Sequence, residues 1–176
     1  MRRAEGNGVS WNNNQCLSWI TARNFSRERD NGAGKNCHAE QGRGAFCNGK
    51  KIQVLDEDNI NKILIGLDGG KETETFKRAS LARYEERLYS SNGVTCTLSS
   101  GCASVPLALV ASGKMHAYLA LSLEPWDMAA GVIINREAGT KVTNVRNKEW
   151  TLDDPSILVA NPLLHSNIYD FIKDLN

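Results

Sequence analysis

The sequence predicts an α/β fold in which a mixed β-sheet is flanked by helices. From residue 37 onward, short apolar runs alternate with longer segments of helical pattern, as expected for interleaved strands and helices. The 176-residue chain is 41% hydrophobic and 23% charged, which is an ordinary globular composition. Residues 1–36 differ, because they hold seven asparagines and a net charge of +3 but few large aliphatic residues. We therefore predict an atypical segment over 1–36 and a folded part over 37–176.

The folded part is predicted to open with a β-hairpin over residues 42–51. Its turn is Asn48-Gly49, the preferred pair for a two-residue type I′ turn, since both positions accept a positive φ. The following segments are predicted to be a buried strand over 61–67, a helix over 72–89 and a strand over 94–98.

The second half continues the alternation of helix and strand. Small residues over 101–112 predict a helix that Gly113 ends. Further along the chain we expect a strand over 116–121, a helix over 126–138 ended by Gly139, a hairpin over 140–145 and 150–152, a strand over 156–160, and a last helix with Asn161 as N-cap and Pro162 as first residue.

Composition also excludes several functional classes. A formal net charge of +1 argues against a general nucleic-acid binder or a polybasic membrane binder. No apolar run approaches the roughly 18 residues of a membrane span, and no secretory signal is visible. Five cysteines without a C-x-x-C pair argue against a disulfide framework or a structural zinc site. We predict reduced thiols and a cytoplasmic location.

Two helix starts are candidates for chemistry. Asp127 lies at the start of a predicted helix with small residues close behind it, and the N-terminus of a helix attracts anions. The alternative is that Asp127 only caps the helix while residues 129–131 allow close packing. The run 99–104 could present backbone N–H groups to a polar ligand, or it could be an ordinary helix entry.

Four motifs, in order and at suitable separations, resemble those of the inositol monophosphatase family. The resemblance covers about residues 37–176. Its motifs are Gly42-x-Gly44-Ala45-Phe46-x-Asn48-Gly49, Gly101-x-Ala103, Ala111-x-Gly113-x-x-x-Ala117-Tyr118, and Trp126-Asp127-x-Ala129-Ala130-Gly131 followed by Glu137-Ala138-Gly139.

The resemblance implies the C-terminal portion of a layered α-β-α-β-α sugar-phosphatase fold. It also implies a Mg²⁺-dependent phosphatase that hydrolyses inositol monophosphate or a related sugar or nucleotide phosphate monoester. Asp127 would be a metal ligand beside the substrate hydroxyl, and Gly101, Cys102 and Ala103 would line the substrate pocket. Carboxylate oxygens suit a hard cation of this kind.

Departures from the family pattern favour an alternative. Cys102 replaces a Ser or Thr, and Ala120 replaces a glutamate that binds substrate in some inositol-specific members. The family's Asp-Pro-Ile-Asp-Gly-Thr loop and Glu-Glu pair, which supply most metal ligands and should precede the first motif, do not occur there. Glu85-Glu86 is predicted to lie on a solvated helix face instead. Asp68, at the end of a strand, is not predicted to join Asp127. The chain could therefore be a truncated, non-catalytic member or a gene fragment, and its exposed apolar surface predicts homo-oligomers.

Overall fold

The computed structural model describes residues 20–23, 36–69, 75–90 and 93–175, and these form two β-sheets with four α-helices. A small antiparallel sheet has the order β1-β2-β3-β4, and a mixed sheet has the order β6-β5-β7-β9-β8. The strands are β1 (Ile20–Arg23), β2 (Asn36–Glu40), β3 (Gly44–Cys47), β4 (Lys50–Ile52), β5 (Leu64–Asp68), β6 (Cys96–Leu98), β7 (Ala117–Ala120), β8 (Lys141–Thr143) and β9 (Ile157–Ala160).

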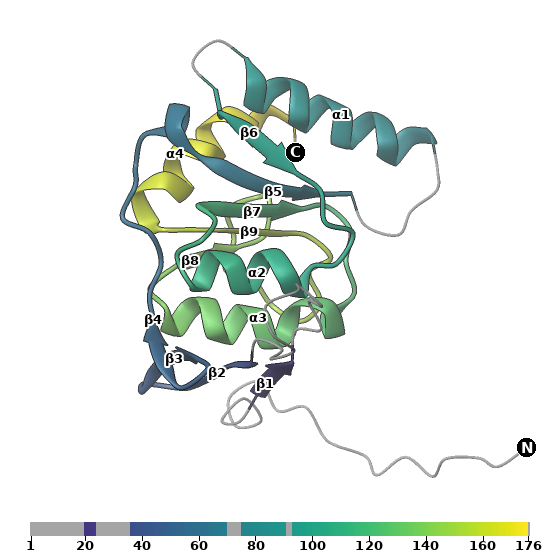
Figure 1. The fold of residues 1–176 in the computed structure, drawn as a ribbon. Coiled ribbons are helices and arrows are strands. Elements are labelled where there is room, and N and C mark those ends of the chain that lie inside the picture. The colour runs from purple at the N-terminus through teal and green to yellow at the C-terminus, as the bar shows by residue number, and fades with distance from the viewer. Residues whose placement is uncertain (1–19, 24–35, 70–74, 91–92, 176) are drawn as a thin grey trace, which may run out of the picture.

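The elements stack in an α-β-α-β order (Figure 1). Helices α1 and α4 cover one face of the five-stranded sheet, α2 and α3 cover the other, and the small sheet lies beyond α3. The helices are α1 (Thr75–Tyr89), α2 (Ser104–Ala111), α3 (Pro125–Glu137) and α4 (Pro162–Ile172), with short 3₁₀ turns at Ile60–Lys62 and Lys173–Leu175. The predicted α/β class with a mixed, helix-flanked sheet is confirmed.

Alternation along the central strands builds a core on each face of the sheet. In β7, Ala117 and Leu119 join the cluster under α1 and α4, whereas Tyr118 and Ala120 join the cluster under α2 and α3. Strand β7 pairs in parallel with β5 and antiparallel with β9. Because both faces are covered, all four residues of β7 are buried.

Glu137 ties the small sheet to the helical layer. Its two carboxylate oxygens accept hydrogen bonds from the backbone N–H groups of Gly42 and Gly44, each at 2.8 Å. Both glycines have positive φ, 76° and 88°, so the turn between β2 and β3 uses a conformation that other residues rarely adopt. Two of the motifs quoted above, more than 90 residues apart in the chain, are thus joined by direct contact.

Most elements predicted from the sequence are present. Asn48 and Gly49 form the predicted turn with φ of 50° and 75°. The side chain of Asn161 caps α4 by accepting from the N–H of Leu164. The predicted strand over 150–152 is wrong: β8 is followed by a single bridge from Thr143 to Glu149. The reason is local, because Asp154 bonds the backbone N–H and the hydroxyl of Thr151 and holds this segment as a turn.

The prediction of reduced thiols is wrong for two cysteines. Cys37 in β2 and Cys47 in β3 form a disulfide. They are direct cross-strand partners in the antiparallel register, and this brings their Cα atoms to 4.1 Å. A count of cysteines cannot reveal such a pair without the strand register. Cys96 and Cys102 are free and exposed, and Cys16 lies outside the described residues.

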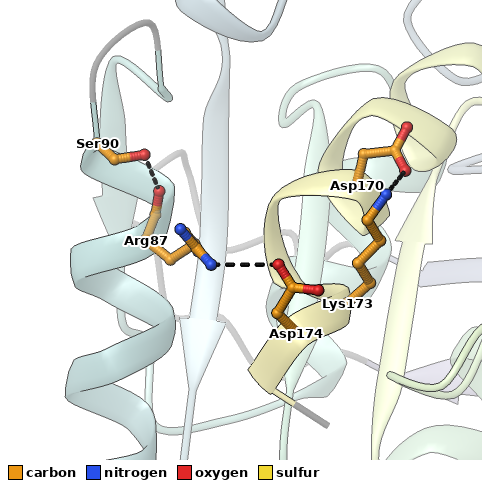
Figure 2. Close-up of polar contacts among 5 residues, drawn as sticks. All are labelled: Arg87, Ser90, Asp170, Lys173 and Asp174. Atoms are coloured by element: carbon orange, nitrogen blue, oxygen red, sulfur yellow. Dashed lines mark hydrogen bonds and ion pairs between the residues drawn. The ribbon is translucent and has the colours of Figure 1, made fainter.

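Polar contacts join the outer helices at the protein surface. Figure 2 shows the Arg87 guanidinium of α1 reaching the Asp174 carboxylate beyond α4, at 3.4 Å. It also shows Lys173 paired with Asp170 at 3.0 Å and the Ser90 hydroxyl donating to the Arg87 carbonyl. Exposed ion pairs of this kind contribute little to the stability of the fold. The apolar cluster under α1 and α4 therefore accounts for most of their attachment.

Within the described ranges, no helix is both long and apolar enough to cross a membrane. The cytoplasmic location stays a prediction.

Candidate functional site

The candidate site lies where the parallel strands β5, β6 and β7 end. Parallel pairing places the carboxyl ends of these three strands at one edge of the sheet (Figure 1). Asp68 is the last residue of β5, and the segment after β6 runs from Ser99 into α2. Ligands of open α/β sheets commonly bind at this edge.

Asp68 is the polar centre of this edge. Its side chain is buried, with 5% of the residue exposed. Oδ1 accepts from the Ser99 hydroxyl at 2.8 Å and from the Gly101 N–H at 3.3 Å. Oδ2 accepts from the Tyr118 hydroxyl at 3.1 Å and lies 3.4 Å from the Ser100 hydroxyl. Three consecutive loop residues and one strand residue therefore converge on a single carboxylate.

Tyr118 reaches Asp68 because a glycine lies opposite it. Gly66 of β5 pairs with Tyr118 of β7, and a Cβ on Gly66 would meet the Tyr118 ring at 2.8 Å. The ring occupies this space, and its hydroxyl extends along β5 to Asp68. Burial raises the pKa of the Tyr118 hydroxyl far above its usual value, with further contributions first from Asp68 and then from Cys102 and Asp127. Tyr118 is therefore a neutral hydrogen-bond donor.

The predicted pocket residues divide between surface and core. Gly101, with φ of 67°, and Cys102 are exposed, whereas the Ala103 side chain is buried in the cluster under α2 and α3. The Cys102 N–H donates to the Ser100 hydroxyl oxygen at 3.3 Å, and the Cys102 thiol lies 3.2 Å from the Ser104 hydroxyl. The exposed part of the motif is thus Gly101 and Cys102.

Asp127 is the third residue of α3 and is half-buried. Its Oδ2 accepts from the Glu124 N–H at 3.3 Å, and the Glu124 side chain accepts in return from the first turn, forming a capping box. The capping role considered for Asp127 is therefore present. A Cβ on Gly131 would meet Leu107 of α2 at 2.5 Å, so close helix packing also explains that small residue.

The structure brings Asp68, Tyr118 and residues 99–102 together by hydrogen bonds. Within the described ranges Asp127 makes no hydrogen bond to this group, although its charge contributes to the raised pKa of Tyr118. Asp68 and Tyr118 were not predicted to be members of this site. A signal was available for Asp68, because it is an acid at the end of a buried strand that precedes a helix. No sequence feature gave the register that aligns Tyr118 with Gly66.

Residues 20–175 match the model of the inositol monophosphatase family. The chain belongs to this family. The matched range begins inside the segment that the sequence analysis set apart, and it includes β1, which pairs with β2.

Two curated family relatives are similar to most of the described chain. It is 36% identical over 134 residues to the chloroplastic phosphatase IMPL1 of Arabidopsis thaliana, with coverage of 76% of this chain and 35% of that protein. The chain is also 34% identical over 136 residues to inositol-1-monophosphatase of Bacillus subtilis, and the match covers 76% of this chain and 49% of that protein. The chain thus spans half or less of the length of these relatives.

Solved structures of the family share the fold. The extragenic suppressor protein SuhB from Bartonella henselae superposes with a TM-score of 0.73 at 24% identity, over 80% of this chain and 52% of that one. A Thermotoga maritima IMPase superposes with a TM-score of 0.67 at 26% identity, over 81% of this chain and 52% of that one.

The described residues do not form a magnesium site of the kind the family implies. Within those ranges, no group of three or more His, Cys, Asp or Glu side chains could hold a metal ion. A carboxylate offers about four acceptor positions, and hydrogen bonds occupy most of those of Asp68. Asp127 is one carboxylate, and Mg²⁺ usually needs further oxygen ligands from carboxylates, substrate phosphate and water.

Proposed function

We propose that the chain is a phosphatase of the inositol monophosphatase family that acts on inositol monophosphate or a related sugar or nucleotide phosphate monoester. The observation that carries the proposal is the placement of two family motifs at one edge of the sheet. Gly101 donates its N–H to Asp68, and the hydroxyl of Tyr118, from a second motif, donates to the same carboxylate. Asp127, from the motif that follows, is the last of the groups that raise the pKa of Tyr118. The Arabidopsis and Bacillus relatives are both named as phosphatases, which supports the proposal.

The proposal gives the chain's own residues limited roles. The backbone of Gly101 and Cys102, both exposed residues, would contact the alcohol part of the substrate, and Asp127 would lie beside the substrate hydroxyl. We also propose Mg²⁺ as the cofactor, with Asp127 as one ligand. Because the described residues do not complete a magnesium site, we derive no metal-dependent step from them.

A panel of substrates tests this function. Phosphate release by the purified chain is measured with Mg²⁺ on inositol 1-phosphate, fructose 1,6-bisphosphate and 3′-phosphoadenosine 5′-phosphate. We expect turnover of at least one of them and a loss of 100-fold or more in kcat for Asp127→Asn. Asp153→Asn changes an exposed acid in the turn before β9 and should keep full activity. Turnover that survives Asp127→Asn would contradict the assigned role.

A second candidate is a non-catalytic family member, such as the truncated form or gene fragment named above, that binds a phosphate ester or a partner without turnover. The hydrogen bonds accepted by Asp68 and by Oδ2 of Asp127 favour this candidate, because both carboxylates already stabilise the fold. Calorimetric binding of inositol 1-phosphate without phosphate release, with and without Mg²⁺, would support this candidate. Mg²⁺-dependent turnover well above background would exclude it.

We further propose that copies of the chain associate through exposed apolar side chains. Trp126 at the start of α3 is 74% exposed and Leu163 of α4 is 63% exposed. Large exposed apolar groups often mark contact surfaces. Light scattering at working concentrations should report species larger than a monomer, and Trp126→Ser should reduce their fraction. A clean monomer would contradict the proposal.

A further inference from the structure

Asp68 is a buried carboxylate to which neither the family resemblance nor the proposed reaction gives a role. It does not lie on the surface that a substrate would reach, since only 5% of the residue is exposed. A buried carboxylate is costly unless hydrogen bonds compensate for the lost water. The donors that compensate for the burial of Asp68 therefore matter to its role.

The donors belong mainly to one loop. Ser99 and Gly101 donate to Oδ1, and the Ser100 hydroxyl lies near Oδ2. The single proton of the Ser100 hydroxyl is shared with the Cys102 carbonyl, which lies 3.0 Å away. Cys102 N–H donates to that same Ser100 oxygen. Ser100 thus connects Asp68 to Cys102, an exposed residue of the predicted pocket.

The carboxylate itself is fixed by the sheet. Strand β5 lies between β6 and β7, and its last residue pairs with Ala120 of β7. The Asp68 carbonyl accepts from the Leu121 N–H at 3.1 Å, which extends this pairing past the strand end. On the side-chain side, Tyr118 packs over Gly66 and donates to Oδ2. Asp68 is thus a rigid acceptor that faces a loop.

We propose that Asp68 is a positioning residue that holds the loop 99–101 in the conformation that binds substrate. The effect on substrate rests on the proposed function, whereas the effect on the loop does not. Most of the acceptor capacity of Asp68 is used by these donors, so it acts through Gly101 and Cys102 rather than by direct contact with substrate.

Residue-resolved amide hydrogen exchange by NMR tests the loop. In Asp68→Asn, the Gly101 and Cys102 amides should exchange at least tenfold faster than in the wild type. Ser99→Ala removes only the shortest of the contacts and should give a smaller increase at the same amides. Because Ser99 is exposed, this variant keeps the test available if Asp68→Asn does not fold.

The chain supplies a matched control loop. The backbone N–H groups of Arg146 and Lys148 both donate to Asn144 Oδ1 at 3.0 Å, so a side chain also holds this turn. Their exchange should be unchanged in Asp68→Asn and faster in Asn144→Ala, which should leave Gly101 and Cys102 unaffected. Unchanged exchange at Gly101 and Cys102 in both loop variants would overturn the proposal.

Steady-state kinetics with inositol 1-phosphate test the effect on substrate. If the wild type turns this ester over, Ser99→Ala and Asp68→Asn should raise KM about tenfold and change kcat much less. An unchanged KM together with faster exchange would overturn the positioning role. If the wild type neither binds nor hydrolyses any of the panel substrates, the proposed function fails, and the exchange rates alone decide whether Asp68 holds the loop.

Discussion

Asp68 and His165 are buried on opposite faces of the five-stranded sheet, and their partners differ. Asp68, on the face covered by α2 and α3, is surrounded by donors from the loop 99–101 and from Tyr118. His165, on α4, is fully buried, and its Nε2 forms a hydrogen bond with the Thr143 hydroxyl at 2.8 Å. Within the described residues, its Nδ1 has no hydrogen-bond partner.

The contacts of Thr143 define the protonation of His165. The Thr143 hydroxyl donates its proton to the Asn144 carbonyl at 2.8 Å, so Nε2 carries the hydrogen that it donates to Thr143. A second proton would enter the core at Nδ1, where it finds no acceptor. Burial, with a lesser contribution from Lys141, lowers the pKa of His165 to about 4. On one face of the sheet, hydrogen bonds therefore compensate for the burial of Asp68. On the other face, the fold accommodates His165 only in its neutral form.

The largest effect is expected from removing the compensated carboxylate. Asp68→Ala should lower the free energy of unfolding by about 3–4 kcal/mol, because the buried Tyr118 hydroxyl and the loop donors lose their acceptor. Urea unfolding monitored by circular dichroism measures the change. Asp56→Ala, at an exposed acid, should stay within about 0.5 kcal/mol of the wild type. A similarly small change for Asp68→Ala would show that Tyr118 and the loop donors form hydrogen bonds with water in place of the carboxylate.

Acidification should reveal the uncompensated group on the other face. The folded state has the lower His165 pKa, so between about pH 6.5 and pH 4 the unfolded state binds the proton more readily. The free energy of unfolding should therefore fall as the pH decreases through this window, by about 3 kcal/mol in total. Above pH 6.5 this contribution is constant.

His165→Gln isolates this effect, since glutamine does not titrate. The difference in unfolding free energy between wild type and His165→Gln should change across pH 4–6.5, while the carboxylates contribute equally to both proteins. A difference that is independent of pH would contradict the buried, neutral state of His165.

A smaller effect is expected at the hydroxyl that joins β7 to Asp68. Tyr118→Phe keeps the ring over Gly66 but removes one donor, so the loss of stability should be about 1 kcal/mol. Tyr169→Phe, at a half-buried position of α4, provides the control. A loss near that of Asp68→Ala would show that Tyr118, rather than the loop, carries most of the compensation.

The smallest change in stability is expected at Asp127. Asp127→Ala removes one side of the capping box of α3, which should cost about 0.5–1 kcal/mol. The same variant should abolish turnover if the proposed function is correct. Thermal unfolding alongside the phosphatase assay separates the two. A stability loss as large as that of Asp68→Ala would indicate that Asp127 is chiefly structural.

Local signals in the sequence predicted most of the fold. The Asn48-Gly49 turn, the Asn161 cap and the Gly113 helix end each depend on neighbours in the chain, and the structure contains all three. That Gly101 and Asp127 belong to one site is a prediction that rests on the family resemblance of their motifs. The predicted roles of Gly101, Cys102, Ala103 and Asp127 remain to be tested.

Features that depend on strand register could not be predicted. The Cys37–Cys47 disulfide requires the pairing of β2 with β3, and the contact of Tyr118 with Asp68 requires the pairing of β5 with β7. The strand expected over 150–152 failed because the Asp154 side chain competes for the backbone of Thr151. The disulfide and the Tyr118 contact each depend on a partner ten or more residues away in the chain. The strand is lost because a side chain replaces a hydrogen bond between strands.

The central claim is that the edge of the sheet around Asp68 forms a phosphate-ester site from the motifs of Gly101 and Asp127. Titration of the ¹⁵N-labelled chain with inositol 1-phosphate in the presence of Mg²⁺ tests it most directly, because it reports binding without requiring turnover. We predict that the largest saturable amide shifts occur at residues 99–103 and 126–128, with the Arg146 and Lys148 amides unchanged. Shifts that are absent, or that cluster away from these two segments, would contradict the account.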